Sequence, residues 1–383
     1  MTAIPPAERK SALVLAGGGI MGAAYEIGCL SALDRLFSPG FSCRHFDMYV
    51  GVSAGSIIAA LVASRLAPAA LFKAIINDEH TAFNWHRSDI YKLDLSEVAA
   101  GILRLLRNTW PIIQAHRRNH WSFSIADLFS IIQEQFPAGL FSLTPMEEYL
   151  RRTFAAEGLS TDFTRLHTEL YIPAYDLDLG RRVVFGAEPF RDVNICQAIT
   201  ASCAIPYFFR PHQVKEGYYI DGSYGRVSHI DIAIEQGAKL IVLVNPRVPM
   251  ENDRERFCMP TLSFGQCSSI AELGITHAWE QSMRIETKEK LEMAVQFYRR
   301  QRPDVDIVIL EPGREESLLF FLSPMSNASR NHVMSYGYQL TIGQLRERYN
   351  ELAPIFARHG ILTRDDRLFA PAPGTDGAPE ERR

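Results

Sequence analysis

Three short stretches of the sequence combine residue types that could carry out acyl transfer. They are GGGIMG at residues 17–22, GVSAG at residues 51–55 and DGSYG at residues 221–225. A serine hydroxyl becomes a nucleophile when a neighbouring base takes its proton, and backbone amides at a glycine turn can stabilise the oxyanion that then forms. The three stretches therefore offer a nucleophile, oxyanion donors and a base.

The GVSAG stretch follows a mostly apolar run at residues 46–50 and precedes a helix of small residues predicted over 53–64. A G-x-S-x-G sequence between a strand and a helix is typical of a nucleophile elbow, in which the glycines allow a sharp turn and the serine projects from the end of the strand. Ser53 is therefore the candidate nucleophile. The alternative is a small-residue turn without chemistry.

The GGGIMG stretch also satisfies the G-x-G-x-x-G pattern of dinucleotide-binding proteins. Such a protein carries an acid at the end of its second strand, where this chain has GVSAG instead. We therefore favour the interpretation that the amides of Gly17, Gly18 and Gly19 bind an oxyanion at a helix N-terminus. A ligand-free turn and a nucleotide-binding oxidoreductase are the alternatives.

The base predicted from the sequence is an aspartate. The eleven histidines are dispersed, and the two nearest to a promising segment, His212 and His229, are interpreted as surface or structural residues. Asp221 ends the predicted strand 217–221, which would place its carboxylate at the carboxyl edge of the sheet. Desolvation there would raise its affinity for a proton. The alternative is that Asp221 only binds the amides of a turn.

The order of elements predicts an α/β protein with a mostly parallel sheet. Only one strand and one helix precede the strand that carries Ser53, which argues against the standard α/β-hydrolase layout. A capping box with a proline at the first helical position is predicted at residues 144–147. The predicted strands are 12–16, 47–51, 169–175, 182–185, 217–221, 239–244 and 305–311, and the predicted helices are 20–37, 53–64, 192–203, 229–236 and 277–301.

Length and composition predict one domain. With 383 residues, 47% of them hydrophobic, the chain can bury a large core. We expect a single domain at 11–369, made of a core at 11–250, a helical insertion at about 70–140 and a C-terminal extension at 251–369. The ends, 1–10 and 370–383, are predicted to be disordered.

Charge and cysteine content bear on partners and compartment. The net charge of −4 argues against nucleic acid as a partner. Six scattered cysteines indicate neither a disulfide framework nor a zinc site, so a reducing, cytoplasmic location is expected. No metal or cofactor is predicted, and the oligomeric state is left open. Without 18 successive apolar residues, a transmembrane helix is not expected.

Residues 97–119 form an arginine-rich amphipathic segment that contains Trp110. Such a segment could make peripheral contact with an anionic membrane. The alternative is an ordinary helix pair packed on the core with a solvated basic face. Pro111 is expected to break the helix.

In this order, the three motifs resemble those of the patatin-like phospholipase family. Residues 198–206 and 231–244 also resemble that family, so the resemblance covers about 11–245. It implies a three-layer α/β/α fold with a mostly parallel central sheet, a helical insertion and a helical C-terminal region. It further implies a Ser53–Asp221 dyad with the amides of Gly17, Gly18 and Gly19 as the oxyanion hole, and no metal. The implied activity is hydrolysis of carboxylic esters of phospholipids or lysophospholipids through an acyl-serine intermediate.

Two positions depart from the family pattern. Met21 stands where many members have a basic residue, and Ser223 replaces the second glycine of D-G-G. These departures keep two other hypotheses open. One is a patatin-fold lipid- or protein-binding module with weak or no catalysis, and the other is an acyltransferase that uses the same dyad.

Overall fold

The computed structural model of the chain describes residues 10–77, 87–93, 95–118, 138–226, 228–253, 255–256, 269–315, 319 and 329–369. The two predicted tails lie outside these residues, apart from Lys10.

A central eight-stranded sheet organises the chain, in the order β11-β10-β1-β2-β5-β9-β8, with β6 paired to β5. The strands from β11 to β5 are parallel, so their carboxyl ends meet at one edge. β9 runs antiparallel to β5. The strands are β1 (Ser11–Leu15), β2 (Met48–Gly51), β5 (Glu169–Asp176), β6 (Arg181–Phe185), β8 (His212–Val214), β9 (Gly217–Asp221), β10 (Leu240–Val244) and β11 (Asp306–Leu310).

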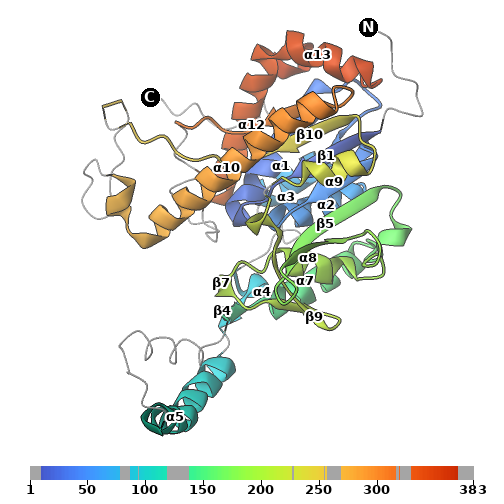
Figure 1. Ribbon diagram of the computed structural model, residues 1–383. Helices are drawn as coiled ribbons and strands as arrows, with labels where there is room; N and C mark the ends of the chain where they lie inside the picture. Colours follow the sequence, from blue (N-terminus) through green and yellow to red (C-terminus); the bar gives the residue numbers. More distant parts are fainter. Residues whose placement is uncertain are drawn as a thin grey trace.

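Helices cover both faces of this sheet (Figure 1). Alternate residues of β1 point to opposite faces, so Leu13 and Leu15 pack with one core cluster while Ala12 and Val14 pack with the other. The first cluster includes α1 (Gly19–Leu36), α2 (Ala54–Ala63) and α12 (Arg330–Glu347), and the second includes α9 (Ile230–Glu235) and α10 (Ile275–Gln301). The predicted three-layer α/β/α class is confirmed.

The C-terminal part of the chain continues the same sheet and core. β11 pairs in parallel with β10, so the strand predicted at 305–311 is confirmed. α12 packs closely along α1, because a Cβ on Gly28 would lie 2.2 Å from the Met334 carbonyl oxygen. Beyond α12, the helix α13 (Tyr349–Arg358) buries Leu352 and Phe356.

A second, smaller sheet was not predicted from the sequence. It has the order β3-β4-β7, made of β3 (Lys92–Leu93), β4 (Gly139–Ser142) and β7 (Tyr207–Phe209). These strands are only two to four residues long, too short to show a periodic pattern. The helices next to these strands in the chain are α4 (Arg87–Ile90), α7 (Thr144–Ala156) and α8 (Ile195–Ser202), whereas α3 (Pro68–Ile76) packs against α1.

Helix α5 (Leu95–Arg118) lies apart from the sheet and its helices (Figure 1). The predicted break at Pro111 is wrong, because the helix continues through it. Proline has no amide hydrogen, so one carbonyl oxygen in the preceding turn of the helix lacks its usual hydrogen bond. Because Pro111 is exposed, water can bind that oxygen. Among the described helices, none is both long and apolar enough to cross a membrane.

The predicted capping box at residues 144–147 is also wrong. Thr144 is already the first residue of α7, and its amide is accepted by the Ser142 hydroxyl at 3.2 Å. Glu147 does not reach back to the helix start, since its carboxylate binds Arg151 at 2.9 Å. Ser142 therefore accepts the Thr144 amide, which the Glu147 side chain would accept in a capping box.

Candidate active site

Ser53 lies in a strained turn between β2 and α2. Its backbone has φ 52° and ψ −132°, a conformation that is rare for a residue with a side chain. The Ser53 amide donates to the Ser202 hydroxyl at 3.0 Å, and that hydroxyl donates to the Pro173 carbonyl oxygen at 2.7 Å. The turn is thus fastened to α8 and β5. Such strain is typical of a nucleophile elbow.

The glycine turn after β1 touches this elbow directly. A Cβ on Gly17, which has φ 74°, would lie 2.3 Å from the Val52 carbonyl oxygen. A Cβ on Gly55 would lie 2.7 Å from the Leu15 carbonyl oxygen. Both contacts are too close for any side chain, so glycine at these positions is what lets the two turns meet.

The three glycines of the turn do not share the same surroundings. The Gly17 amide donates to Glu26 Oε1 at 2.8 Å, beneath the turn. Gly18 caps α1 and Gly19 is its first residue, so their amides have no acceptor within the helix. Ala54 begins α2 in the same way, directly after Ser53. The amides at these two helix starts are available to an anion, whereas the Gly17 amide is already bonded.

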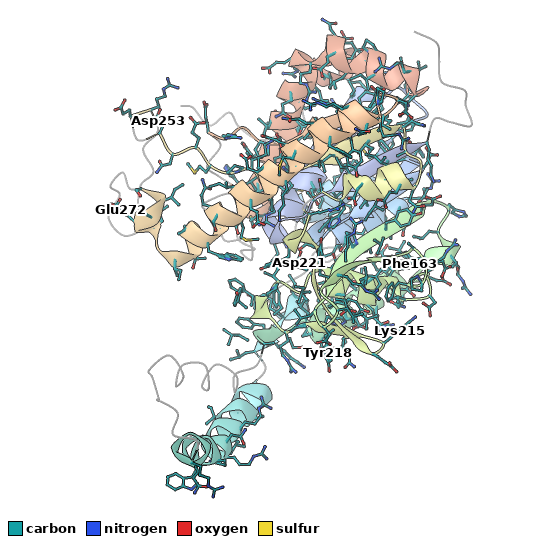
Figure 2. All side chains as sticks on the ribbon, in the orientation of Figure 1. Phe163, Lys215, Tyr218, Asp221, Asp253 and Glu272 are labelled. Carbon is teal, nitrogen blue, oxygen red and sulfur yellow. The ribbon has the colours of Figure 1, made fainter. Side chains whose placement is uncertain are left out.

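Asp221 ends β9 and is 1% exposed. Its Oδ1 accepts the Ser223 amide at 2.8 Å, and its own amide donates to the Ala204 carbonyl oxygen at 3.0 Å. Figure 2 shows Asp221 toward the middle of the molecule, far from the outlying helix α5. The end of α8 and the loop after it therefore connect the two candidate residues, since Ser202 binds the elbow and Ala204 binds Asp221.

Burial raises the pKa of the Asp221 carboxyl above its ordinary value. Hydrogen bonding from Ser53, hydrogen bonding from Ser223 and the charge of Arg247 each lower that pKa in part. The Ser53 hydroxyl is near enough to act on the carboxyl, yet a hydrogen bond of ordinary geometry is not formed, since Asp221 Oδ2 has no partner among the described residues. An open acceptor position on a buried carboxyl is what a general base needs.

His229 supports the loop that follows Asp221. Its Nδ1 lies 3.1 Å from Arg182 Nη1, which can only donate, so Nδ1 is the acceptor and Nε2 carries the proton. Nε2 then donates to the Gly222 carbonyl oxygen at 2.9 Å. Burial lowers the pKa of His229 to about 4, which keeps the ring neutral. His212 lies elsewhere, 3.0 Å from Glu147.

The two residues that depart from the family pattern are both buried. Met21 is 1% exposed, packs in the first core cluster and is not among the residues that line the cavity described below. Ser223 keeps the turn after Asp221 through its amide, as a glycine would, and its hydroxyl also lowers the pKa of the Asp221 carboxyl. The described residues hold no group of three or more histidine, cysteine, aspartate or glutamate side chains suited to a metal ion.

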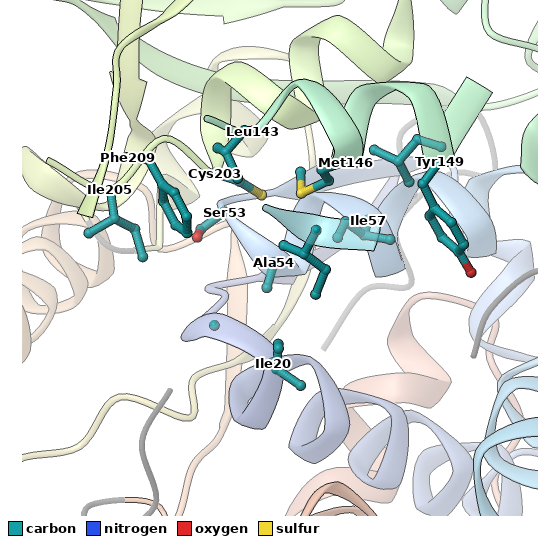
Figure 3. A pocket seen from close by; sticks show the side chains of 13 residues that line it. Ile20, Ser53, Ala54, Ile57, Leu143, Met146, Tyr149, Cys203, Ile205 and Phe209 are labelled. Carbon is teal, nitrogen blue, oxygen red and sulfur yellow. The ribbon is translucent and has the colours of Figure 1, made fainter. Parts of the chain in front are cut away.

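An apolar cavity of about 550 Å³, counting the space at its open mouth, begins at Ser53. In Figure 3, Ser53 lies near Phe209 and Ile205 on one side of the view, and Tyr149 lies on the other side. Sequence reasoning missed this cavity, because the lining comes from segments far apart in the chain. Its apolar walls include Ile20, Ile57, Ile90, Leu143, Met146 and Phe209.

Glu26 provides a prediction about pH and stability. Its side chain is fully buried beneath the glycine turn, and burial raises its pKa to about 8. A carboxyl whose pKa is raised on folding stabilises the protein below the unfolded pKa of about 4.5, and this stability is lost as the pH rises toward 8. Glu26→Gln can still accept the Gly17 amide but cannot ionise. We expect the melting temperature of the variant to fall less than that of the wild type between pH 5 and pH 8.5. An equal fall in both proteins would show that Glu26 does not titrate in this way.

The fold and the site define an α/β protein in which a serine elbow, a glycine turn and a buried aspartate meet at the carboxyl edge of a mostly parallel sheet. A model of the patatin-like phospholipase family matches residues 13–234, more than half of the chain. The chain therefore belongs to the patatin-like phospholipase family. Membership supports lipid ester hydrolysis as the general class of activity.

Two solved structures are similar to the chain. VipD from Legionella pneumophila has 14% sequence identity and a TM-score of 0.34, over 90% of this chain and 68% of that one. The type III effector protein ExoU has 18% identity and a TM-score of 0.35, over 90% of this chain and 54% of ExoU. The chain thus spans about half the length of ExoU. No curated protein matches the chain.

Proposed function

We propose that this protein is a serine acyl hydrolase that cleaves carboxylic esters of phospholipids or lysophospholipids. The observation that carries the proposal is that Ser53, in its strained elbow, opens into an apolar cavity and has the buried Asp221 beside it. This arrangement supplies a nucleophile, a base and a place for an acyl chain.

The proposed reaction has two halves. Ser53 Oγ attacks the ester carbonyl carbon while Asp221 takes the hydroxyl proton, and the Gly18 and Gly19 amides stabilise the oxyanion. The carbon–oxygen bond to the alcohol then breaks, and Asp221 protonates the leaving alcohol. Water next attacks the acyl-serine, giving its proton to Asp221, and collapse of this second intermediate releases the fatty acid and returns the proton to Ser53.

Burial explains how an aspartate can act without a histidine. A carboxylate in water has a pKa near 3.9 and is a weak base at neutral pH. Desolvation raises the pKa of Asp221, which makes its carboxylate a better proton acceptor. The amides at the helix starts of α1 and α2 supply further stabilisation, because positive helix ends favour the developing oxyanion.

The cavity favours a substrate with one acyl chain held beside Ser53. Its lining runs from Ser53 over side chains that are almost entirely apolar, as expected of a site for hydrocarbon. The side chains between Ser53 and Tyr149 are apolar, so they would bind hydrocarbon and exclude the head group (Figure 3). We therefore take lysophospholipids as the first substrates to test.

Helix α5 is the part of the chain that we propose contacts a membrane. Ile102, Leu103 and Trp110 are 49%, 66% and 62% exposed on the same helix as Arg104 and Arg107. Exposed apolar side chains among arginines are typical of helices that lie on anionic lipid surfaces. Such contact would bring the cavity close to its lipid substrate.

A panel of lipid esters tests the proposal. We expect purified protein to release fatty acid from lysophospholipids, faster from anionic than from zwitterionic vesicles, with the products identified by mass spectrometry. Transfer of the acyl group to water gives free fatty acid, whereas transfer to another alcohol, as in an acyltransferase, gives a new ester. Failure to cleave any ester, under conditions in which a known lysophospholipase is active, would contradict the proposal.

A further inference from the structure

The segment that follows β10, residues 245–250, is braced beside the glycine turn. Asn245 donates its amide to the Leu310 carbonyl oxygen at 2.9 Å, and its Oδ1 accepts the Arg247 amide at 3.2 Å. From α10, Gln281 bonds to both the amide and the carbonyl oxygen of Met250, at 3.1 and 2.7 Å. The backbone of Arg247 is therefore fixed from both sides.

Arg247 lies against the glycine turn itself. A Cβ on Gly18 would be 3.4 Å from Arg247 Cγ and 3.4 Å from Pro246 Cγ. Burial raises the pKa values of Asp221 and Tyr224, and the charge of Arg247 lowers both in part, so the guanidinium lies close to both side chains. Arg247 is half-buried between the oxyanion amides and the candidate base.

The neighbouring arginine is already bonded, whereas Arg247 is not. Arg284 donates to Glu280 at 2.9 Å, to the Val248 carbonyl oxygen at 3.2 Å and to the Leu319 carbonyl oxygen at 2.9 Å. Arg247 also lies close to Glu280, because burial raises the pKa of that carboxyl and the charges of Arg247 and Arg284 lower it. Glu280 is bonded to Arg284, and within the part of the chain that the structure describes the Arg247 guanidinium makes no hydrogen bond or ion pair of ordinary geometry. The Tyr224 hydroxyl is likewise buried without a partner among those residues.

We propose that Arg247 binds the phosphate of the lipid substrate, which makes it a residue that selects phosphate-bearing esters. The inference rests on the proposed hydrolase function. A planar guanidinium donates two parallel hydrogen bonds to a phosphate. In a glycerol-based lipid the phosphate is close to the scissile ester, as Arg247 is close to Gly18. Many family members have a basic residue at the position of Met21 in α1. In this chain, Arg247 in the loop after β10 would provide the positive charge instead.

Two substrates with the same acyl chain test this inference, a lysophospholipid and an uncharged monoacylglycerol. We expect Arg247→Gln to lower kcat/KM for the lysophospholipid by about 10- to 100-fold, the loss expected for hydrogen bonds to a charged group. At a pH where Asp221 stays ionised in both proteins, the rate on the monoacylglycerol should stay near the wild-type rate. Arg247→Lys should recover part of the loss, because it restores the charge without the paired donors.

The matched control is Arg300→Gln. Arg300 is an exposed arginine at the far end of α10, so this change should alter neither rate. Equal losses on both substrates, or no loss on either, would overturn the inference. Binding of the lysophospholipid by Ser53→Ala, with and without Arg247→Gln, is measured by calorimetry. Weaker binding in the double variant supports the phosphate site even if the wild type cleaves no ester, and unchanged binding overturns it.

Discussion

Replacing Ser53 with alanine is expected to reduce ester hydrolysis by at least about 10³-fold, because no acyl-enzyme can form. The residual rate would come from the oxyanion amides and from substrate binding alone. The same change should abolish covalent labelling by a fluorophosphonate probe, which reacts with activated serine hydroxyls. Folding should be preserved, since the smaller side chain fits where the serine is buried and the backbone bonds of the elbow remain.

Ser31→Ala is the matched control for this experiment. Ser31 is a buried serine on α1 whose hydroxyl donates to the Ile27 carbonyl oxygen of the same helix, at 2.8 Å. This variant should keep wild-type labelling and activity. If Ser53→Ala retained either property, Ser53 would not be the nucleophile.

The sequence predicted the parallel core of the fold because most of its strands are nearly continuous apolar runs. Predicted strands and observed strands agree to within two residues at β1, β2, β10 and β11. β1, β2 and β10 are buried on both faces, so their pattern does not depend on what packs against them. β11, at the edge of the sheet, buries Val308 and Leu310. The helix α1 was predicted because apolar side chains recur along it at helical spacing, and α2 because small and apolar residues run through it.

The direction of β9 could not be predicted from its residues. β5 extends beyond the end of β2, and β9 returns antiparallel along it, so Asp221 pairs with Ala174 rather than ending a parallel strand. Asp221 still reaches the carboxyl edge, because Gly222 lies against Val52 and the Pro173 carbonyl oxygen. A strand pattern specifies which side chains share a face but not the neighbour or its direction.

The surroundings of the site required the structure, because they are contacts between distant segments. The Gly17 amide was expected to face an oxyanion, and only the packing of α1 shows that Glu26 accepts it. Arg247 lies 229 residues after Gly18 in the chain, in a loop without a recognisable motif. Motifs predicted the candidate nucleophile and base, whereas the cavity and the cation depend on tertiary contacts.

Asp221→Asn is expected to lower kcat by about 10²- to 10⁴-fold, the usual contribution of a general base. Asparagine has nearly the same shape and can still accept the Ser223 amide through its oxygen, so the turn should remain. It cannot take the Ser53 proton. Circular dichroism and thermal melting of the variant will check that the loss is chemical rather than structural.

The pH dependence of wild-type activity also tests whether Asp221 is the general base, without a mutation. A protonated Asp221 cannot act as a base, so kcat/KM should rise with pH as this carboxyl loses its proton. Because burial raises the pKa of Asp221, the rise should be centred at a higher pH than the ordinary aspartate value of about 3.9. The residual activity of Asp221→Asn should lack this rise.

Asp176→Asn is the control that distinguishes loss of the general base from a general effect of removing a buried carboxylate. Asp176 is a second buried aspartate, at the end of β5, and it accepts the Leu179 amide at 2.9 Å. This variant should keep the acid limb of the pH profile and most of the activity. If the two variants lost activity equally, or if the acid limb survived in Asp221→Asn, the proton of Ser53 would have to pass to another group. The neutral His229 cannot be that group, because its Nδ1 accepts from Arg182 and its Nε2 donates to Gly222.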